Sequence, residues 1–286
     1  MKEDFDSLLP ALKLNRRGFI ATALGSSFAL AVQPALAQSV IETDSAGLIA
    51  GAIQVPVADG MMDVYRAQPE QGTKLPTVLV ISEIFGVHAY IADVCRRLAK
   101  LGYLAVAPSL FTRQGDPSRL SSIPEIQATI IRKVPDAQVK SDLDALVAWA
   151  GKHGGDPKRV GITGFCWGGR ITWLYAHHNP SLKAGVAWYG RLRGDVTANT
   201  PRHPLDLADN LHVPVLGLYG GQDQGIPLAD VDVMNDKLKT AGGKSMIHVY
   251  PDAPHAFHAD YRSYYRAPAA QDGWQRMQAW FKQHGI

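Results

Sequence analysis

The residues of this chain best suited to chemistry are a cysteine between glycines and, further along, an aspartate and a histidine. The run Gly164-Phe165-Cys166-Trp167-Gly168-Gly169 follows directly on the apolar stretch 160–163, so a strand ends where the cysteine opens a helix. The glycines permit a tight turn, because a Cβ at either flanking position would collide with neighbouring backbone. The turn exposes the sulfur at a helix N-terminus, where unpaired N–H groups and the helix dipole favour a thiolate. We predict that Cys166 is a nucleophile.

Strands and amphipathic helices alternate along most of the chain. The sequence predicts strands at 49–57, 61–67, 77–82, 103–107, 160–163, 184–188, 213–219 and 245–250. Helices are predicted at 90–101, 136–150, 228–241 and 270–284, with one more directly after the cysteine. This order predicts an α/β fold with a doubly wound, mostly parallel sheet. In such a sheet the chemistry lies at the carboxyl ends of the strands, so partners for Cys166 are expected there.

Two candidate partners for Cys166 each follow a predicted strand. Asp223 ends the run Gly-Gly-Gln-Asp after one strand, and His255 lies in Asp-Ala-Pro-His after the last strand. Either residue alone would be an ordinary loop residue, but the chain order of nucleophile, aspartate and histidine is that of a catalytic triad. His255 would take the thiol proton or pair with the thiolate, and Asp223 would hold the imidazole in the required tautomer.

An acidic residue follows the predicted buried strand at 77–82. A carboxylate such as Glu83 is costly there unless it meets a partner; the alternative is a solvated loop residue. The same loop is placed to supply one backbone N–H to an oxyanion hole. The N–H of Trp167, which follows the nucleophile, would supply the other.

Together these motifs resemble those of the dienelactone hydrolase (carboxymethylenebutenolidase) family. The resemblance runs from about residue 49 to the end of the chain and rests on S-E-I-F-G-V at 82–87, A-P-S-L-F-T-R-Q at 107–114, G-F-C-W-G-G at 164–169, Y-G-G-Q-D at 219–223 and H-A-F at 255–257. It implies a fold of the α/β-hydrolase type. It also implies a carboxylic-ester hydrolase that cleaves an ester or enol-lactone, with the triad named above.

The resemblance assigns roles to further residues. It implies that Glu83 takes the thiol proton when substrate binds, and that Ile84 and Trp167 supply the oxyanion N–H groups. Arg113 matches the family's arginine that grips a substrate carboxylate, a contact that suits a planar guanidinium.

The chain departs from the family pattern around the substrate. Ala259 stands where the family has a second substrate-binding arginine; Arg262, three residues later, is a hypothesis for the same role. A tyrosine expected soon after Arg113 is also missing, since Gly115-Asp116-Pro117 occupies that stretch. The resemblance therefore predicts the reaction without identifying the natural substrate, a small ester or lactone with or without a carboxylate.

Two other functions stay open at this point. A non-catalytic periplasmic protein could bind small molecules on the same scaffold, although binding gives no reason to keep Cys, Asp and His together. A redox protein would use Cys95 and Cys166, the two cysteines of the chain, but there is no C-x-x-C motif. Cys95 falls on the apolar stripe of the helix at 90–101, so we predict that it is a buried small hydrophobe.

The first 37 residues have the pattern of an export signal. Asn15-Arg16-Arg17-Gly18 contains twin arginines, a mildly apolar run follows, and Ala35-Leu36-Ala37 ends it. We predict export by the twin-arginine route to the periplasm, with residues 38–286 as a single mature domain. A retained membrane anchor is the alternative, but Pro34 and two serines dilute the apolar run.

Composition and side-chain spacing argue against several classes of partner. The signal holds four Lys/Arg and three Asp/Glu, so its removal lowers the formal charge from +3 to +2, which favours neither nucleic acid nor an anionic membrane as partner. No metal site is predicted, because His177 and His178 point apart on a helix and nothing completes a site with His255 and His258. No cofactor is expected, and no feature specifies an oligomeric state.

Two expectations concern the faces of helices. The carboxylates of Asp136, Asp142 and Asp144 are interpreted as the solvated face of the helix at 136–150. The last helix carries a stripe of large apolar residues that predicts core packing; these are Trp274, Met277, Trp280 and Phe281.

Overall fold

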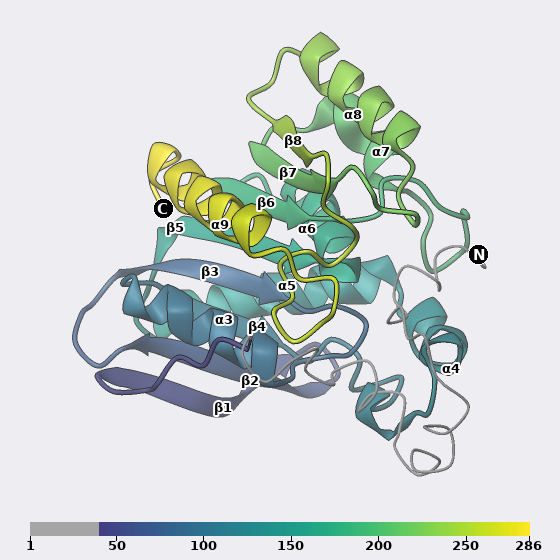
Figure 1. The fold of residues 1–286 in the computed structure, drawn as a ribbon. Helices are drawn as coiled ribbons and strands as arrows, with labels where there is room; N and C mark the ends of the chain where they lie inside the picture. The colour runs from purple at the N-terminus through teal and green to yellow at the C-terminus, as the bar shows by residue number, and fades with distance from the viewer. Residues whose placement is uncertain (1–39) are drawn as a thin grey trace, which may run out of the picture.

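A computed structural model describes residues 40–286 of the chain (Figure 1). The predicted export signal at 1–37 lies outside the described residues. Within 40–286, none of the helices combines the length and the apolar character that a bilayer span needs.

The described residues form an eight-stranded sheet in the order β1-β2-β4-β3-β5-β6-β7-β8. The strands are β1 (Leu48–Val57), β2 (Gly60–Pro69), β3 (Leu75–Ile81), β4 (Leu104–Pro108), β5 (Gly155–Phe165), β6 (Ala184–Trp188), β7 (Val215–Gly220) and β8 (Met246–Tyr250). β2 pairs antiparallel with both β1 and β4, whereas all pairs from β4 to β8 are parallel. The predicted α/β class with a mostly parallel sheet is confirmed.

Helices cover both faces of this sheet. They are α3 (Ala89–Lys100), α4 (Ile123–Thr129), α5 (Asp136–Lys152), α6 (Trp167–His178), α7 (Pro204–Leu207), α8 (Leu228–Thr240) and α9 (Ala267–Gln283). Figure 1 shows α3 and α9 in front of the sheet and α5 and α6 behind it. The strands β4, β6 and β7 are buried along their whole length, as expected for parallel strands with helices on both faces.

Short helical pieces that the sequence analysis did not predict lie in two of the connections. α4 begins after Ser122, whose hydroxyl accepts a hydrogen bond from Glu125 N at 3.3 Å, and 3₁₀ turns lie on either side of it. α7 spans only four residues. Such pieces carry too few apolar positions to reveal a helical period in the sequence.

Two of the three carboxylates on α5 are buried, so their interpretation as a solvated face is wrong. Asp136, 4 % exposed, receives two 2.7 Å hydrogen bonds from Arg170, and Asp142, 1 % exposed, pairs with Arg113 at 2.7 Å. A guanidinium from another element thus neutralises each carboxylate, which offsets the cost of removing it from water. Asp144 is exposed, as expected.

The other predictions about helix faces are confirmed. Cys95 is fully buried on α3, and burial raises the pKa of its thiol. Both cysteines are free, so the redox alternative has no disulfide behind it. On α9, Met277 and Phe281 are fully buried and Trp280 nearly so, while the partly buried Trp274 packs against the core.

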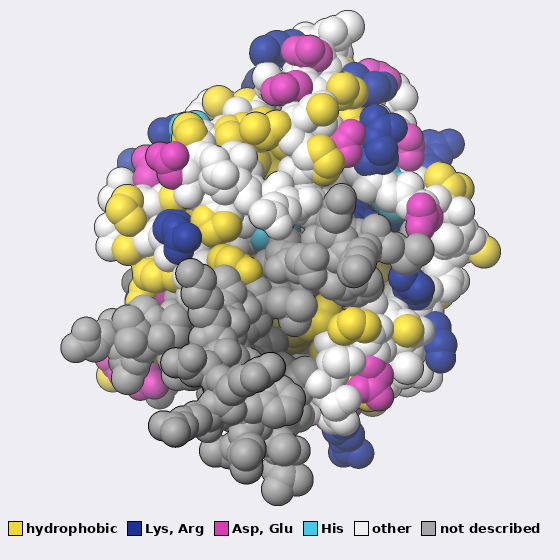
Figure 2. All heavy atoms as spheres, turned by 45° about the vertical axis from the view of Figure 1, so that its right-hand side comes forward, with side chains coloured by type: hydrophobic (Ala, Val, Ile, Leu, Met, Phe, Trp, Pro, Cys, Tyr) yellow, Lys and Arg dark blue, Asp and Glu magenta, His cyan; other side chains and the backbone are white. Residues whose placement is uncertain are grey.

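Charges of both signs are mixed on the described surface. In Figure 2, lysine and arginine side chains lie among aspartate and glutamate side chains. Some form exposed pairs, such as Lys237 with Asp209 at 2.6 Å and Arg193 with Asp230 at 2.9 Å. Pairs of this kind contribute little to stability, in contrast to the buried pairs on α5.

Candidate active site

Cys166 lies at the end of β5, on the turn that begins α6. Its backbone has φ 55° and ψ −113°, an uncommon conformation for a residue with a side chain, and its N–H donates to Trp188 O at 3.0 Å. A Cβ on Gly164 would lie 2.2 Å from Gly168 O, and one on Gly168 would lie 2.3 Å from Ile81 O. The glycines are therefore required by the close approach of α6 to β5 and β3, as the sequence predicted.

His255 and Asp223 form a short hydrogen bond, with Nδ1 and Oδ2 2.6 Å apart. The second carboxylate oxygen, Oδ1, accepts hydrogen bonds from Gly225 N at 2.9 Å and Ile226 N at 3.2 Å, which orient the carboxylate. With Nδ1 engaged, Nε2 is the imidazole nitrogen left for chemistry. It is buried, and the side chain of Cys166 is the group that acts on it, because a hydrogen bond with Cys166 is among the causes that raise the pKa of His255.

The charges around His255 favour its protonated form. Burial by itself would lower the pKa of the imidazole, but the negative charges of Asp223 and Cys166 outweigh burial and raise this pKa to about 10. The imidazolium is therefore stable at neutral pH in this site. An imidazolium beside a cysteine is the arrangement that activates a thiol as a nucleophile.

Glu83 follows β3 and is buried, with 3 % of its surface exposed. Its carboxylate oxygens lie 3.3 Å from Tyr261 Oη and 3.4 Å from His88 Nε2, so the structure places it among polar partners and not in solvent. Burial raises the pKa of Tyr261 well above its usual value, and the charges of Glu83 and Cys166 raise it further. The carboxylate and the sulfur are therefore both close to this one phenol.

A pocket of about 400 Å³ opens beside the sulfur. Ile84, Trp167 and His255 line it together with Cys166. Trp167 is the first residue of α6, so its N–H has no acceptor within the helix and is available to an oxyanion. Other wall residues are charged, among them Arg132, Arg170 and Arg191.

The structure does not bring the two predicted substrate-binding arginines to this pocket. Arg113 pairs with Asp59 and Asp142 and is absent from the pocket walls. Arg262 is buried, and its guanidinium lies 5.8 Å from the centroid of the Phe85 ring. Neither arginine contributes to the walls beside Cys166, so neither enters the proposal below.

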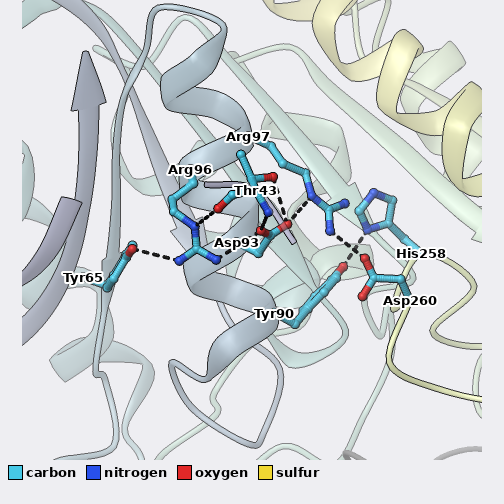
Figure 3. A network of polar contacts seen from close by, with 8 residues as sticks. All are labelled: Thr43, Tyr65, Tyr90, Asp93, Arg96, Arg97, His258 and Asp260. Carbon is cyan, nitrogen blue, oxygen red and sulfur yellow. Dashed lines mark hydrogen bonds and ion pairs between the residues drawn. The ribbon is translucent and has the colours of Figure 1, made fainter. Parts of the chain in front are cut away.

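A buried polar network holds the loop that carries His255 (Figure 3). Asp260, on this loop, pairs with Arg97 of α3 at 2.6 Å, and Arg97 also binds Asp93 one turn earlier on the same helix. Thr43 N donates to Asp93 Oδ1 at 2.6 Å, so the beginning of the described chain joins the network. The loop is thus fixed to α3 and through it to the segment before β1.

His258 lies in the loop after β8 and is buried. Its Nδ1 lies 2.6 Å from the hydroxyl of Tyr90, and its ring stacks on Phe165 with 5.3 Å between centroids. Burial, and then the charge of Arg97, lower the pKa of His258 well below its usual value, so the ring is neutral at pH 7. His258 therefore supports the strand end that carries Cys166.

Sequence reasoning missed the tyrosines around this site. Tyr189 lines the pocket, and its ring meets that of His255 edge-on with centroids 5.1 Å apart. One signal for it was present, because Tyr189 directly follows a predicted strand, the kind of position that identified Asp223. Tyr90 and Tyr261 gave no such signal, because their partners are distant in the sequence.

The parallel sheet, with a strand–turn–helix around a nucleophile-type residue at the end of β5, defines an α/β-hydrolase fold. A model of the dienelactone hydrolase family matches residues 62–285, and the chain belongs to that family.

Relatives with similar sequences match this chain over nearly its whole length. A "Putative carboxymethylenebutenolidase" of Methylorubrum extorquens strain AM1 is 59 % identical over 284 residues, covering 99 % of this chain and 98 % of that protein. A protein of the same description from Escherichia coli K12 is 53 % identical over 267 residues, covering 93 % and 98 %. The crystal structure of a "Putative Dienelactone Hydrolase" from Klebsiella pneumoniae is 54 % identical with a TM-score of 0.81, covering 82 % of this chain and 99 % of that one. The protein is thus a hydrolase of the dienelactone hydrolase type, and the non-catalytic alternative has no support.

Proposed function

We propose that this hydrolase cleaves a small ester or enol-lactone through a covalent thioester on Cys166, with His255 and Asp223 as the other members of a triad. One observation carries the proposal: Cys166 lies on the turn between β5 and α6, in the same pocket as an imidazole bonded to Asp223 at 2.6 Å. The pKa of about 10 for His255 supports a thiolate–imidazolium pair. The proposed reaction needs no cofactor.

In the first half of the reaction the thiolate attacks the carbonyl carbon and forms a carbon–sulfur bond. The carbonyl oxygen becomes an oxyanion, stabilised by the N–H groups of Ile84 and Trp167. When this adduct collapses, the carbon–oxygen bond breaks and the leaving oxygen takes the Nε2 proton of His255. The products are a thioester on Cys166 and the released alcohol or enol.

In the second half, neutral His255 takes a proton from a water molecule that attacks the thioester. The carbon–sulfur bond breaks, the acid product leaves, and the thiolate–imidazolium pair is restored. We propose that the sulfur keeps its proton until substrate binds, when Glu83, a carboxylate close to it, takes this proton and leaves the thiolate beside the imidazolium. Glu83 returns the proton to the sulfur after the acid product leaves. Because a thiolate leaves a tetrahedral adduct more readily than an amide nitrogen does, esters should be cleaved and amides should not.

The test compares the two cysteines of the chain. Cys166→Ala should reduce hydrolysis of p-nitrophenyl acetate by at least about 10³-fold, because no nucleophile remains. Cys95→Ala is the matched control: this thiol is buried on α3, so the variant should keep its activity and lose roughly 1 kcal/mol of stability. Mass spectrometry of rapidly quenched wild type should show the acyl group on Cys166. Full activity of purified Cys166→Ala would refute the proposal.

We also propose that the protein acts in the periplasm after twin-arginine export. The support is the sequence of residues 1–37, with Arg16 and Arg17 before an apolar run and a small-residue cleavage site. Replacing both arginines with lysine should hold the protein in the cytoplasm as the uncleaved form. Equal amounts of the wild type and this double variant in the periplasmic fraction would contradict the route.

A further inference from the structure

Backbone strain in the described chain collects around the active site, and Tyr189 is part of it. Four non-glycine residues have positive φ: Lys74, Cys166, Tyr189 and Ala256. One is the nucleophile and another directly follows His255. Tyr189, with φ 38°, directly follows β6 and lines the same pocket. Such conformations persist where the surrounding structure imposes them, and they concentrate at functional sites.

The Tyr90 hydroxyl is close enough to Tyr189 to lower its pKa, but the buried hydroxyl of Tyr189 makes no hydrogen bond of good geometry in the described part of the chain. Other buried tyrosines of this protein have one. Tyr219 Oη donates to Gly190 O at 2.9 Å and accepts from Trp173 Nε1 at 3.0 Å, and Tyr261 Oη donates to Glu83. A buried hydroxyl without a well-formed hydrogen bond in the pocket of Cys166 needs an explanation, because buried polar groups are almost always paired.

The groups around this hydroxyl belong to the catalytic site. Burial raises the pKa of Tyr189 well above its usual value and Glu83, Tyr261 and Cys166 raise it further, whereas contact with the Tyr90 hydroxyl lowers it; the phenol therefore remains protonated and can donate to a nearby anion. The titratable groups that face Tyr189 from the surrounding elements are Glu83, Tyr90, Tyr261, His255 and Cys166.

Most of these groups already have a polar partner. The Tyr90 hydroxyl is bonded to His258, 2.6 Å away, and each oxygen of Glu83 contacts a donor group, Tyr261 or His88. The imidazole of His255 is bonded to Asp223 through Nδ1. The sulfur of Cys166 is the acceptor in this group whose negative charge, once formed, is stabilised by the imidazolium and the N-terminus of α6 and has room for one more donor.

We propose that Tyr189 is a further catalytic residue, whose hydroxyl donates a hydrogen bond to the sulfur of Cys166 when the thiol is ionised. This inference rests on the proposed function, since it concerns the same nucleophile. The hydroxyl and the imidazolium then stabilise the thiolate together, and the hydroxyl does so again when the thioester breaks and the thiolate is re-formed.

The test measures the ionisation of Cys166 and needs no substrate. Iodoacetamide alkylates thiolates, so its rate of reaction with native protein across pH reports the midpoint of ionisation; Cys166→Ala gives the background from Cys95. In Tyr189→Phe this midpoint should move to higher pH by about one unit, the effect expected from losing one hydrogen bond to a charged group. The acid limb of kcat/KM for p-nitrophenyl acetate should move by the same amount.

Thermal unfolding separates this role from a structural one. Tyr189→Phe removes a hydroxyl that makes no well-formed hydrogen bond, so its Tm should stay close to that of wild type or exceed it. Tyr219→Phe is the control, since it removes a buried hydroxyl with two hydrogen bonds outside the pocket walls. This control should lower Tm and leave the alkylation midpoint unchanged.

The outcomes distinguish the two proposals. If the wild-type thiol does not react faster than the Cys166→Ala background, the cysteine mechanism itself fails. If the wild-type thiol reacts normally and the midpoint of Tyr189→Phe agrees with it to within about 0.2 unit, the role of Tyr189 is refuted while the triad stands. A lower Tm in Tyr189→Phe without a shifted midpoint would make Tyr189 a packing residue and would also refute the inference.

Discussion

The buried pair of Arg170 and Asp136 should be worth far more to this protein than any of its exposed ion pairs. Both side chains are 6 % exposed and are joined by two hydrogen bonds of 2.7 Å. Arg170→Met would leave the carboxylate buried without a cation, which typically costs about 3–5 kcal/mol. In a chain of this size each kcal/mol lowers Tm by roughly 2–4 °C, so Tm should fall by about 6–20 °C.

Urea and thermal unfolding, followed by circular dichroism, would measure this loss against two controls. Lys237→Met breaks an exposed pair with Asp209 and should cost less than about 1 kcal/mol. Asp136→Leu combined with Arg170→Met removes both charges, and it should be more stable than Arg170→Met alone because no buried charge is left unpaired. The reasoning is refuted if Arg170→Met is no less stable than Lys237→Met, or if the double variant is the least stable of the three.

Three further predictions concern the turn, the extra carboxylate and pH. Gly164→Ala should destabilise the fold by more than about 3 kcal/mol or prevent folding, because its Cβ would lie 2.2 Å from a carbonyl oxygen. Gly151→Ala on α5 is the control and should be tolerated, because the nearest atom to its Cβ would be 3.5 Å away. Unfolding curves would compare the stability of the two variants. Glu83→Gln should lower kcat about tenfold or more with little change in Tm, and an unchanged kcat in ester hydrolysis would reduce Glu83 to a structural residue. The lowered pKa of His258 keeps this ring neutral in the folded protein, whereas in the unfolded chain it takes up a proton below about pH 6.5. The free energy of unfolding should therefore fall by up to roughly 1.4 kcal/mol per pH unit as the pH drops below this value. In His258→Phe, Tm should fall less steeply between pH 6.5 and 5.

The sheet and the chemical motifs were readable from the sequence because each depends on neighbours in the chain. Alternating apolar runs gave the parallel strands, and the glycines around Cys166 gave the turn, since their spacing reflects a local steric requirement. The burial of Asp136 and Asp142 was not readable in this way. Their cations, Arg170 and Arg113, come from other elements, so a helical period showed only three acids on one helix.

Contacts between distant parts of the chain also limited what the sequence could predict about the candidate site. Arg113 was assigned from a motif, but its two carboxylate partners hold it away from the pocket walls, and the sequence does not show that Asp59 and Asp142 meet there. Tyr189 was overlooked because a tyrosine after a strand is ordinary until its buried hydroxyl is found without a well-formed hydrogen bond. Position along the chain predicted where chemistry happens, whereas pairing among distant charges decided which residues take part.

The bond from Thr43 to Asp93 has a consequence for the maturation of this protein. Thr43 lies only a few residues after the predicted cleavage point at Ala37, and Asp93 leads through Arg97 to Asp260, on the loop of His255. Cutting the chain beyond Thr43, or fusing a bulky tag there, would disturb the acid–base residue although the two are far apart in sequence. The beginning of the described chain and the loop of His255 are therefore mechanically linked, although the sheet order places them in different parts of the fold.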